Sequence, residues 1–158
     1  MNQKTIILTI AAFLVFGVGC AQKNTKKNTA KVEQDSIKNK KTMINNFPFK
    51  TRDNEGQFII IAETESPELY PKYASFFEEQ GYSGNGYCWE GHIIQILEKL
   101  NPDLMTHIDF DPEAGCFFAV ANTKENQMKF IELLSPIFAD FTKLEKYIKQ
   151  ADRSRIDD

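Results

Sequence analysis

The residues best suited to chemistry lie around one acidic turn. His107, Asp109 and Asp111 alternate along an extended segment, so their side chains would share one face of a strand. Two carboxylates and an imidazole on one face can hold a divalent metal or share a proton. The same turn, which continues to Glu113, equally fits a solvated hairpin tip or a protein-binding patch. The residue types alone leave these three interpretations open.

Three other residues have catalytic potential. Glu90 could act as a buried acid, although a carboxylate in the first turn of a helix is also favoured by the helix dipole. Cys88 would need a neighbouring base to act as a nucleophile, and we expect His92 to be a satisfied or exposed helix residue. The chain lacks a Gly-x-Ser-x-Gly elbow, a glycine-rich phosphate loop and a His-Glu-x-x-His motif. We therefore expect no enzymatic activity, no cofactor and no metal.

The stretch 81–91 organises the chain around these residues. It holds four of the eight glycines, two of the five tyrosines and the only tryptophan. Glycine is favoured where the backbone needs a positive φ or a close approach, so this stretch predicts a shaped loop. Its aromatic residues either cap the core or form part of a recognition surface on the outer edge of the loop.

Four β-rich segments surround two turn signals. Residues 47–51 and 58–62 flank Asp53-Asn54-Glu55-Gly56, and residues 105–110 and 116–121 flank Asp111-Pro112-Glu113-Ala114-Gly115. Each pair predicts a β-hairpin.

Helical patterns follow each hairpin. One helix restarts at Pro71 and ends near Gly81, and the next carries an apolar face from Trp89 and ends at Asn101-Pro102. Thr123 predicts the cap of a third helix, which Pro136 interrupts before a last helix at 141–148.

This order of elements predicts an α+β domain with a four-stranded, largely antiparallel sheet backed by helices. An offset of 59 residues superposes the two halves at four pairs of positions, which suggests an internal duplication. The superposed pairs are Gly56 and Gly115, Phe58 and Phe117, Ala62 and Ala121, and Thr64 and Thr123.

The N-terminus has the features of an export signal. Lys4 precedes an apolar run from Ile6 to Val18 that is too short to span a bilayer comfortably. The sequence Gly17-Val18-Gly19-Cys20 resembles the lipobox of bacterial lipoproteins, in which the cysteine is acylated, although Gly17 replaces the usual aliphatic residue. Cleavage after Ala21 and an uncleaved anchor are the alternatives, and all three place the domain outside the cytoplasm.

The rest of the chain divides into a basic segment and an acidic segment. Residues 21–45 contain seven lysines against two acidic residues, a composition that predicts a disordered tether able to lie on an anionic membrane. Residues 46–158 carry a net charge of −9, from 11 basic and 20 acidic residues. Such a domain is a poor candidate for nucleic acid and a fair one for a basic protein partner, and a solvated acidic surface is the alternative. Cys88 and Cys116 remain as two separate thiols or one disulfide.

Two motifs together resemble the immunity protein 51 family of bacterial polymorphic toxin systems. They are Gly84-Asn85-Gly86-Tyr87-Cys88-Trp89 and Phe110-Asp111-Pro112-Glu113-Ala114-Gly115, about twenty residues apart. The resemblance covers residues 58–148 and implies an α+β, non-enzymatic protein that neutralises a cognate toxin. Many immunity proteins act in the cytoplasm, whereas the export signal predicts that this one meets its toxin at the cell envelope.

The sequence therefore predicts an export signal at 1–20, a tether at 21–45, an immunity-protein-like domain at 46–151 and a polar tail at 152–158. We expect a membrane-anchored lipoprotein, acylated at Cys20, at the bacterial envelope. An envelope accessory lipoprotein without a toxin partner is the alternative function. On the assumption that the glycine loop and the second hairpin tip lie adjacent, the expected toxin-binding residues are Tyr82, Asn85, Tyr87, Trp89, Asp109, Asp111 and Glu113.

Overall fold

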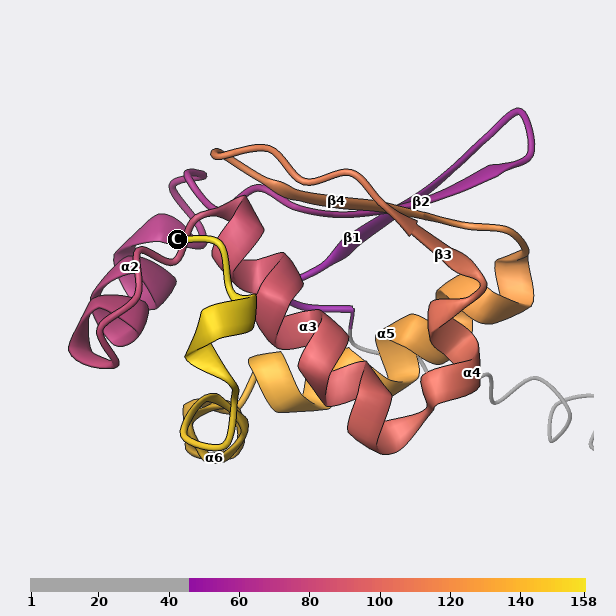
Figure 1. Cartoon of the computed structure of the whole chain (residues 1–158). Coiled ribbons are helices and arrows are strands. Elements are labelled where there is room, and N and C mark those ends of the chain that lie inside the picture. Colours follow the sequence, from indigo (N-terminus) through magenta and orange to yellow (C-terminus); the bar gives the residue numbers. More distant parts are fainter. Residues whose placement is uncertain (1–45) are drawn as a thin grey trace, which may run out of the picture. The chain divides into compact units, whose positions relative to one another are not determined.

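The computed structural model describes residues 46–158, so the export signal, Cys20 and the lysine-rich tether lie outside the described residues. Four strands form one antiparallel sheet in the order β1-β2-β4-β3, and the helices lie on one side of it (Figure 1). This arrangement confirms the predicted α+β class. The strands are β1 (Lys50–Asn54), β2 (Gln57–Ala62), β3 (Ile108–Phe110) and β4 (Phe117–Ala121). The helices are α2 (Tyr70–Glu79), α3 (Gly86–Leu100), α4 (Pro102–Met105), α5 (Lys124–Phe138), α6 (Phe141–Ile148) and the 3-10 helix η1 (Arg153–Arg155).

The first hairpin forms around a two-residue turn. Asn54 faces Gln57 across the turn, and both turn residues have positive φ, 50° at Glu55 and 87° at Gly56. Turns of this kind match the twist of paired strands and require left-handed backbone at both positions. The first strand begins at Lys50, three residues later than predicted, because residues 47 and 48 form a turn.

The second hairpin is shorter than predicted. Residues 105–107 were expected in a strand, but α4 occupies Pro102–Met105 and β3 begins only at Ile108. Asn101 accounts for the difference, because its side chain accepts a hydrogen bond from the Leu104 N–H at 3.3 Å and starts a new helical turn. Leu104 is buried, which anchors that turn to the core.

The two central strands, β2 and β4, pair antiparallel, with Ile60 opposite Ala119 at the middle of the paired segment. Alternation directs Phe58, Ile60 and Ala62 of β2 to the helical side of the sheet. The predicted repeat offset also superposes Ile60 on Ala119, but the duplication itself stays a prediction.

Two helix signals had different outcomes. The Thr123 hydroxyl accepts from the Asn126 N–H at 3.2 Å, which confirms the predicted cap of α5. The predicted interruption at Pro136 is wrong, since α5 continues to Phe138. Pro136 is exposed near the C-terminal end of the helix, and its neighbours Ser135 and Phe138 are buried, so packing holds the last turn in place.

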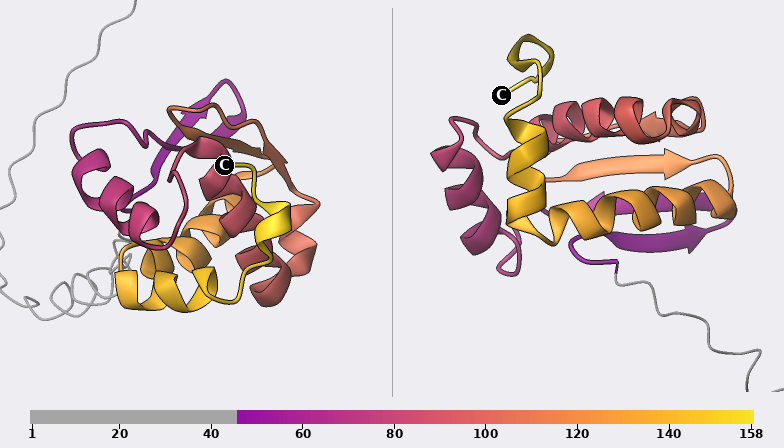
Figure 2. Two further views of the ribbon diagram at one scale, coloured as in Figure 1. Left: turned by 60° about the vertical axis from the view of Figure 1, so that its left-hand side comes forward. Right: turned by 90° about the horizontal axis from the view of Figure 1, so that it is seen from below.

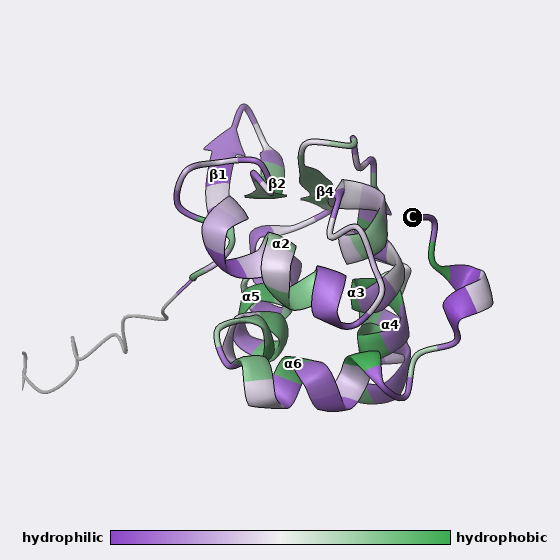
Figure 3. Cartoon of the chain, turned by 90° about the vertical axis from the view of Figure 1, so that its left-hand side faces the viewer, coloured by the Kyte–Doolittle hydropathy of each residue, from purple (hydrophilic) through white to green (hydrophobic). Residues whose placement is uncertain are grey.

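The core lies between the sheet and the helices. Figure 2 shows α3 and α5 running along the strands, with α2 and α6 near one end. Phe49 is at the centre, with its ring 5.4–6.1 Å from those of Trp89, Phe117, Phe130 and Phe138. Figure 3 shows β2 and β4 as hydrophobic strands and β1 as hydrophilic. Within residues 46–158 no helix is long and apolar enough to cross a membrane.

The residues that the sequence assigns to a polar tail pack against α3. Asp152 donates its N–H to the Gln95 side chain at 2.7 Å, and Gln95 donates back to the Asp152 carbonyl at 3.1 Å. Ile156 is only 9% exposed and lies over Gly91, where an added Cβ would be 3.0 Å from Ile156.

Candidate functional site

The glycine loop and the second hairpin turn are joined at the start of α3. The Gly86 N–H donates to the Ala114 carbonyl at 3.0 Å. A Cβ at Gly86 would lie 2.0 Å from the Glu113 carbonyl oxygen and 2.1 Å from that of Cys116, so only glycine fits this contact. The two segments are therefore adjacent, as the predicted patch requires.

Local capping shapes the loop. The Asn85 side chain accepts from the Cys88 N–H at 2.8 Å and begins α3, while the Ser83 hydroxyl accepts from the Asn85 N–H at 3.2 Å. Gly84 has a φ of 70°, and a Cβ there would approach Phe77 to 3.0 Å. These motif residues thus have a role in folding whether or not they touch a partner.

Two aromatic residues of the predicted patch belong to the core. Trp89 is 0% exposed and Tyr82 is 8% exposed, whereas Tyr87 and Asn85 are half-buried. The Trp89 ring lies 4.8 Å from that of Phe138, so the apolar face of α3 draws it inward. The expectation that Trp89 and Tyr82 present their side chains to a partner is corrected accordingly.

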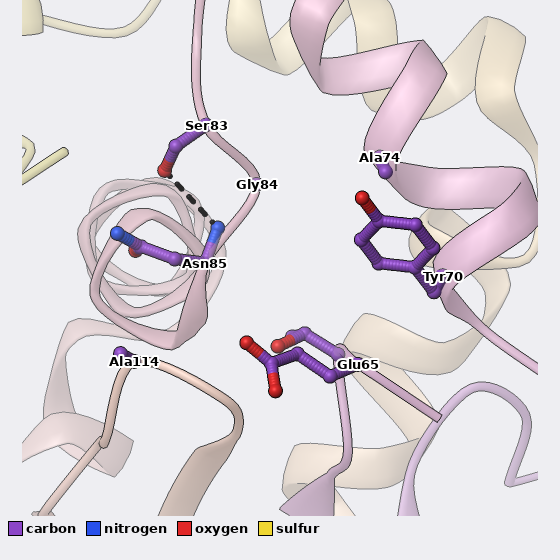
Figure 4. Close-up of a pocket in the computed structure, with 8 residues that line it drawn as sticks. Glu65, Tyr70, Ala74, Ser83, Gly84, Asn85 and Ala114 are labelled. Carbon is purple, nitrogen blue, oxygen red and sulfur yellow. Dashed lines mark hydrogen bonds between the residues drawn. The ribbon is translucent and has the colours of Figure 1, made fainter. Parts of the chain in front are cut away.

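A small pocket opens beside the junction. Figure 4 shows the Glu65 carboxylate between the loop at 83–85 on one side and the Tyr70 ring on the other. The cavity has a volume of about 80 Å³. Its walls are Thr64 and Glu65 after β2, Tyr70 and Ala74 of α2, Ser83, Gly84 and Asn85 of the loop, and Ala114 of the hairpin turn.

The pocket has an acidic surround. Glu65 forms no ion pair among residues 46–158. Its carboxylate lies beside Gly115, where an added Cβ would be 3.2 Å from Glu65 Oε2. The pKa of the neighbouring Cys116 is raised, chiefly by burial and further by the charges of Glu113 and Glu63. Tyr70 is 57% exposed, so its ring face is open to contact. A cationic side chain could therefore pair with Glu65 and stack on Tyr70.

Asp109 and His107 lie in a different place. They line an open groove along β3 with Thr106, Ile108, Val120, Ala121 and Asn122. The His107 ring bonds to the Asn122 side-chain nitrogen at 3.0 Å. Within the described residues, no three His, Cys, Asp or Glu side chains cluster as a metal site requires. The alternative of a metal held by His107, Asp109 and Asp111 therefore finds no support in this geometry.

The buried titratable groups complete the picture of this region. His92 is 1% exposed, and its Nε2 has no hydrogen-bond partner among residues 46–158, which corrects the expectation of a satisfied or exposed residue. Burial lowers the pKa of His92 to about 4 and raises that of Cys88 to about 12. A thiol with so high a pKa is a poor nucleophile. Cys88 and Cys116 are both free, so the alternative of a disulfide between them is wrong.

Sequence spacing contains a signal for the burial of one of these residues, His92. His92 lies three residues after Trp89 and four before Ile96, which places it on the buried face of α3. No such signal exists for Glu65 and Tyr70, because the pocket combines them with a loop and a turn up to about fifty residues away.

The junction and most of the pocket lie within a segment that matches a known family, whereas Thr64 and Glu65 of the pocket precede that segment. The family model described as Immunity protein 51 matches residues 68–153, more than half of the chain. No curated protein and no solved structure matches the chain. The match spans α2, the glycine loop and the hairpin turn, the segments that meet around the pocket. The chain therefore belongs to the immunity protein 51 family.

Proposed function

We propose that this protein is a non-enzymatic immunity protein that binds a cognate protein toxin and blocks its active surface. The observation that carries the proposal is the convergence of three family-matched segments around one pocket, whose carboxylate, Glu65, lies just before the matched residues. Because the domain carries a net charge of −9, we propose a toxin with a basic surface.

The binding surface is centred on the pocket. A lysine or arginine of the toxin enters it, pairs with Glu65 and stacks on Tyr70. Asn85, Tyr87 and Glu113 surround this contact, since they lie in or beside the joined loop and turn. Trp89 and Tyr82 do not contact the toxin, because their side chains are buried and stabilise the conformation of the loop.

The protein meets its toxin at the cell envelope. The apolar run before Cys20 supports export, and the lipobox-like sequence supports a lipid anchor at that cysteine. The lysines of residues 21–45 favour contact with an anionic membrane. The acidic domain is then presented on a basic stalk.

The test is co-expression of the full chain with the product of the neighbouring toxin-like gene. The wild type should give survival and a stable complex. Glu65→Arg combined with Glu113→Arg should abolish both, while the circular dichroism and melting temperature stay close to wild type, because both side chains lie at the surface.

A charge-matched control isolates the pocket. Glu125→Arg with Glu132→Arg changes the net charge equally on the exposed face of α5 and should preserve protection. Full protection by the Glu65 and Glu113 variant would show that the pocket is not the toxin-binding site. Death of cells that contain folded, correctly localised wild type would favour the accessory lipoprotein instead.

A further inference from the structure

Within residues 46–158, one face of the sheet has no layer over it. The helices cover the side that faces α3 and α5, and no helix or strand of residues 46–158 lies over the opposite side (Figures 1 and 3). An antiparallel sheet with one solvated face normally alternates hydrophobic and polar residues. The two central strands read instead Gln-Phe-Ile-Ile-Ile-Ala and Phe-Phe-Ala-Val-Ala, which are apolar on both faces.

Four apolar side chains occupy the centre of this face. Ile59 and Ile61 of β2 pair with Val120 and Phe118 of β4, on the side away from the helices. All four are partly exposed, and none packs against the core. Burial of such side chains is favourable by about 25 cal/mol per Å², so this centre is a place for a partner.

The flanking strands place basic residues along one edge of this face, on β1, and acidic residues along the other, at β3. Arg52 pairs with Ile59 on one side, and Asp109 pairs with Val120 on the other. Lys50 pairs with Ile61, and the Asp111 N–H bonds to the Phe118 carbonyl at 3.0 Å. Both rows thus run from a base through two apolar residues to an acid, over about 14 Å. Lys50 already pairs with Glu63 of the same copy at 2.5 Å, so Arg52 and Asp109 carry the charge contrast between the two edges. We call this surface the outer face: Lys50, Arg52, Ile59, Ile61, Phe118, Val120, Asp109 and Asp111.

The outer face is complementary to itself. A second copy, rotated by half a turn about an axis parallel to the strands and between β2 and β4, brings the two apolar centres together. The basic edge of each copy then meets the acidic edge of the other, with Arg52 near Asp109. An axis across the strands would instead place like charges together, so the charges select one arrangement.

The charges also favour a second copy over a basic toxin. With Glu63, which pairs with Lys50 at 2.5 Å, the outer face has two bases against three acids, a net charge of −1 within a domain of net charge −9. It is therefore a surface where two acidic copies can approach with little local repulsion. The acidic pocket beside Glu65 is the better site for a basic partner.

We propose that the outer face is a homodimer interface, with β2 and β4 of two copies packed face to face and Arg52 paired with Asp109 across the dimer. Eight residues are fewer than the roughly 20–30 residues per side of a standard interface, so the dimer is reversible. The proposal does not depend on the toxin.

The test uses two differently tagged copies of the full chain, expressed together, with one tag captured and the other measured. Arg52→Asp alone and Asp109→Arg alone should each reduce co-purification by about tenfold, because like charges then meet twice in each dimer. Both changes in one chain should restore it. Arg52 and Asp109 lie on opposite edges of the sheet in a single copy, so the restoration must come from contact between copies.

The control is Lys146→Asp, which makes the same change of charge as Arg52→Asp at an exposed position on α6 and should leave co-purification intact. Wild-type copies that do not co-purify would overturn the proposal. So would a double variant as weak as the single variants, or equal loss in the control. Circular dichroism of each variant excludes unfolding as the cause of a loss.

Discussion

His92 is an imidazole in an apolar setting, with its ring 4.6 Å from that of Tyr82 and 5.6 Å from that of Phe77. Burial lowers its pKa to about 4, with smaller and opposite effects from Asp158 and Arg153. The unfolded chain takes up the proton near pH 6.5, whereas the folded protein resists it. The part of the folding stability that depends on neutral His92 is therefore fully present above about pH 6.5 and is lost as the pH falls toward 4.

We predict that His92→Phe flattens this dependence, because phenylalanine keeps an aromatic ring and does not titrate. From pH 7 to pH 4.5, the free energy of unfolding of the wild type should fall by roughly 2–3 kcal/mol more than that of the variant. Denaturant unfolding of both proteins at the two pH values measures this. An equal fall in both would assign the acid sensitivity to carboxylates elsewhere.

Gly86 and Gly56 are required by the fold for two different reasons. Gly86 lacks room for a Cβ, which would lie about 2 Å from two backbone carbonyls, whereas Gly56 has open space but a φ of 87°. We predict that Gly86→Ala destabilises the fold by about 3 kcal/mol or more, because the loop and turn must separate. Gly56→Ala should cost only about 1 kcal/mol of backbone strain. Equal losses in thermal or denaturant unfolding would contradict the crowding at Gly86.

At the scale of elements, the C-terminal segment acts as part of the α3 surface. Arg155 forms two hydrogen bonds with the Glu98 carboxylate, at 2.6 and 2.9 Å, and the Arg153 guanidinium lies 4.3 Å from the Tyr82 ring centroid. The pKa of Glu98 is lowered, first by its hydrogen bond with Arg155. Ion pairs this exposed contribute little, whereas Ile156 is a buried hydrophobic anchor.

We therefore predict that Ile156→Ala lowers the free energy of unfolding by about 2 kcal/mol and that Arg155→Ala lowers it by less. Both variants should be compared with the wild type by denaturant unfolding in the same buffer. A larger loss in Arg155→Ala would show that charge, rather than burial, holds the segment to α3.

Most elements follow from local pattern, and the exceptions have tertiary causes. The first hairpin, the Thr123 cap and the end of α3 at Asn101 are local backbone preferences that the sequence displays. The Asn101 side chain starts the extra turn at Pro102–Met105, and the burial of Leu104 holds that turn to the core, whereas the continuation of α5 through Pro136 depends on the burial of Phe138. These two burials depend on distant segments, which a local pattern does not contain.

At the scale of the molecule, charge is distributed unevenly over residues 46–158. The carboxylates Glu65 and Glu113 lie near the Gly115 turn, Glu63 pairs with Lys50, and the outer face of the sheet is close to neutral. The proposed toxin-binding surface is thus acidic, and the proposed dimer surface is close to neutral.

We predict that the association rate with the toxin falls on the order of tenfold when the salt concentration is raised from 50 to 500 mM, with a smaller change in the dissociation rate. Stopped-flow measurements at a series of salt concentrations provide the check. A rate that is independent of salt would show that the charge of the domain does not steer the encounter.

The sequence by itself determined the order of elements, the α+β class, the acidic charge of residues 46–158 and the two family motifs. These properties depend on composition and on short-range backbone preferences, which each segment carries alone. Only the tertiary structure decided that Trp89, Tyr82 and His92 are buried and that Glu65 and Tyr70 share a pocket with the loop. It also decided that β2 and β4 have one face that no other part of residues 46–158 covers. Those outcomes depend on which distant segments pack together, and packing is a property of the whole chain.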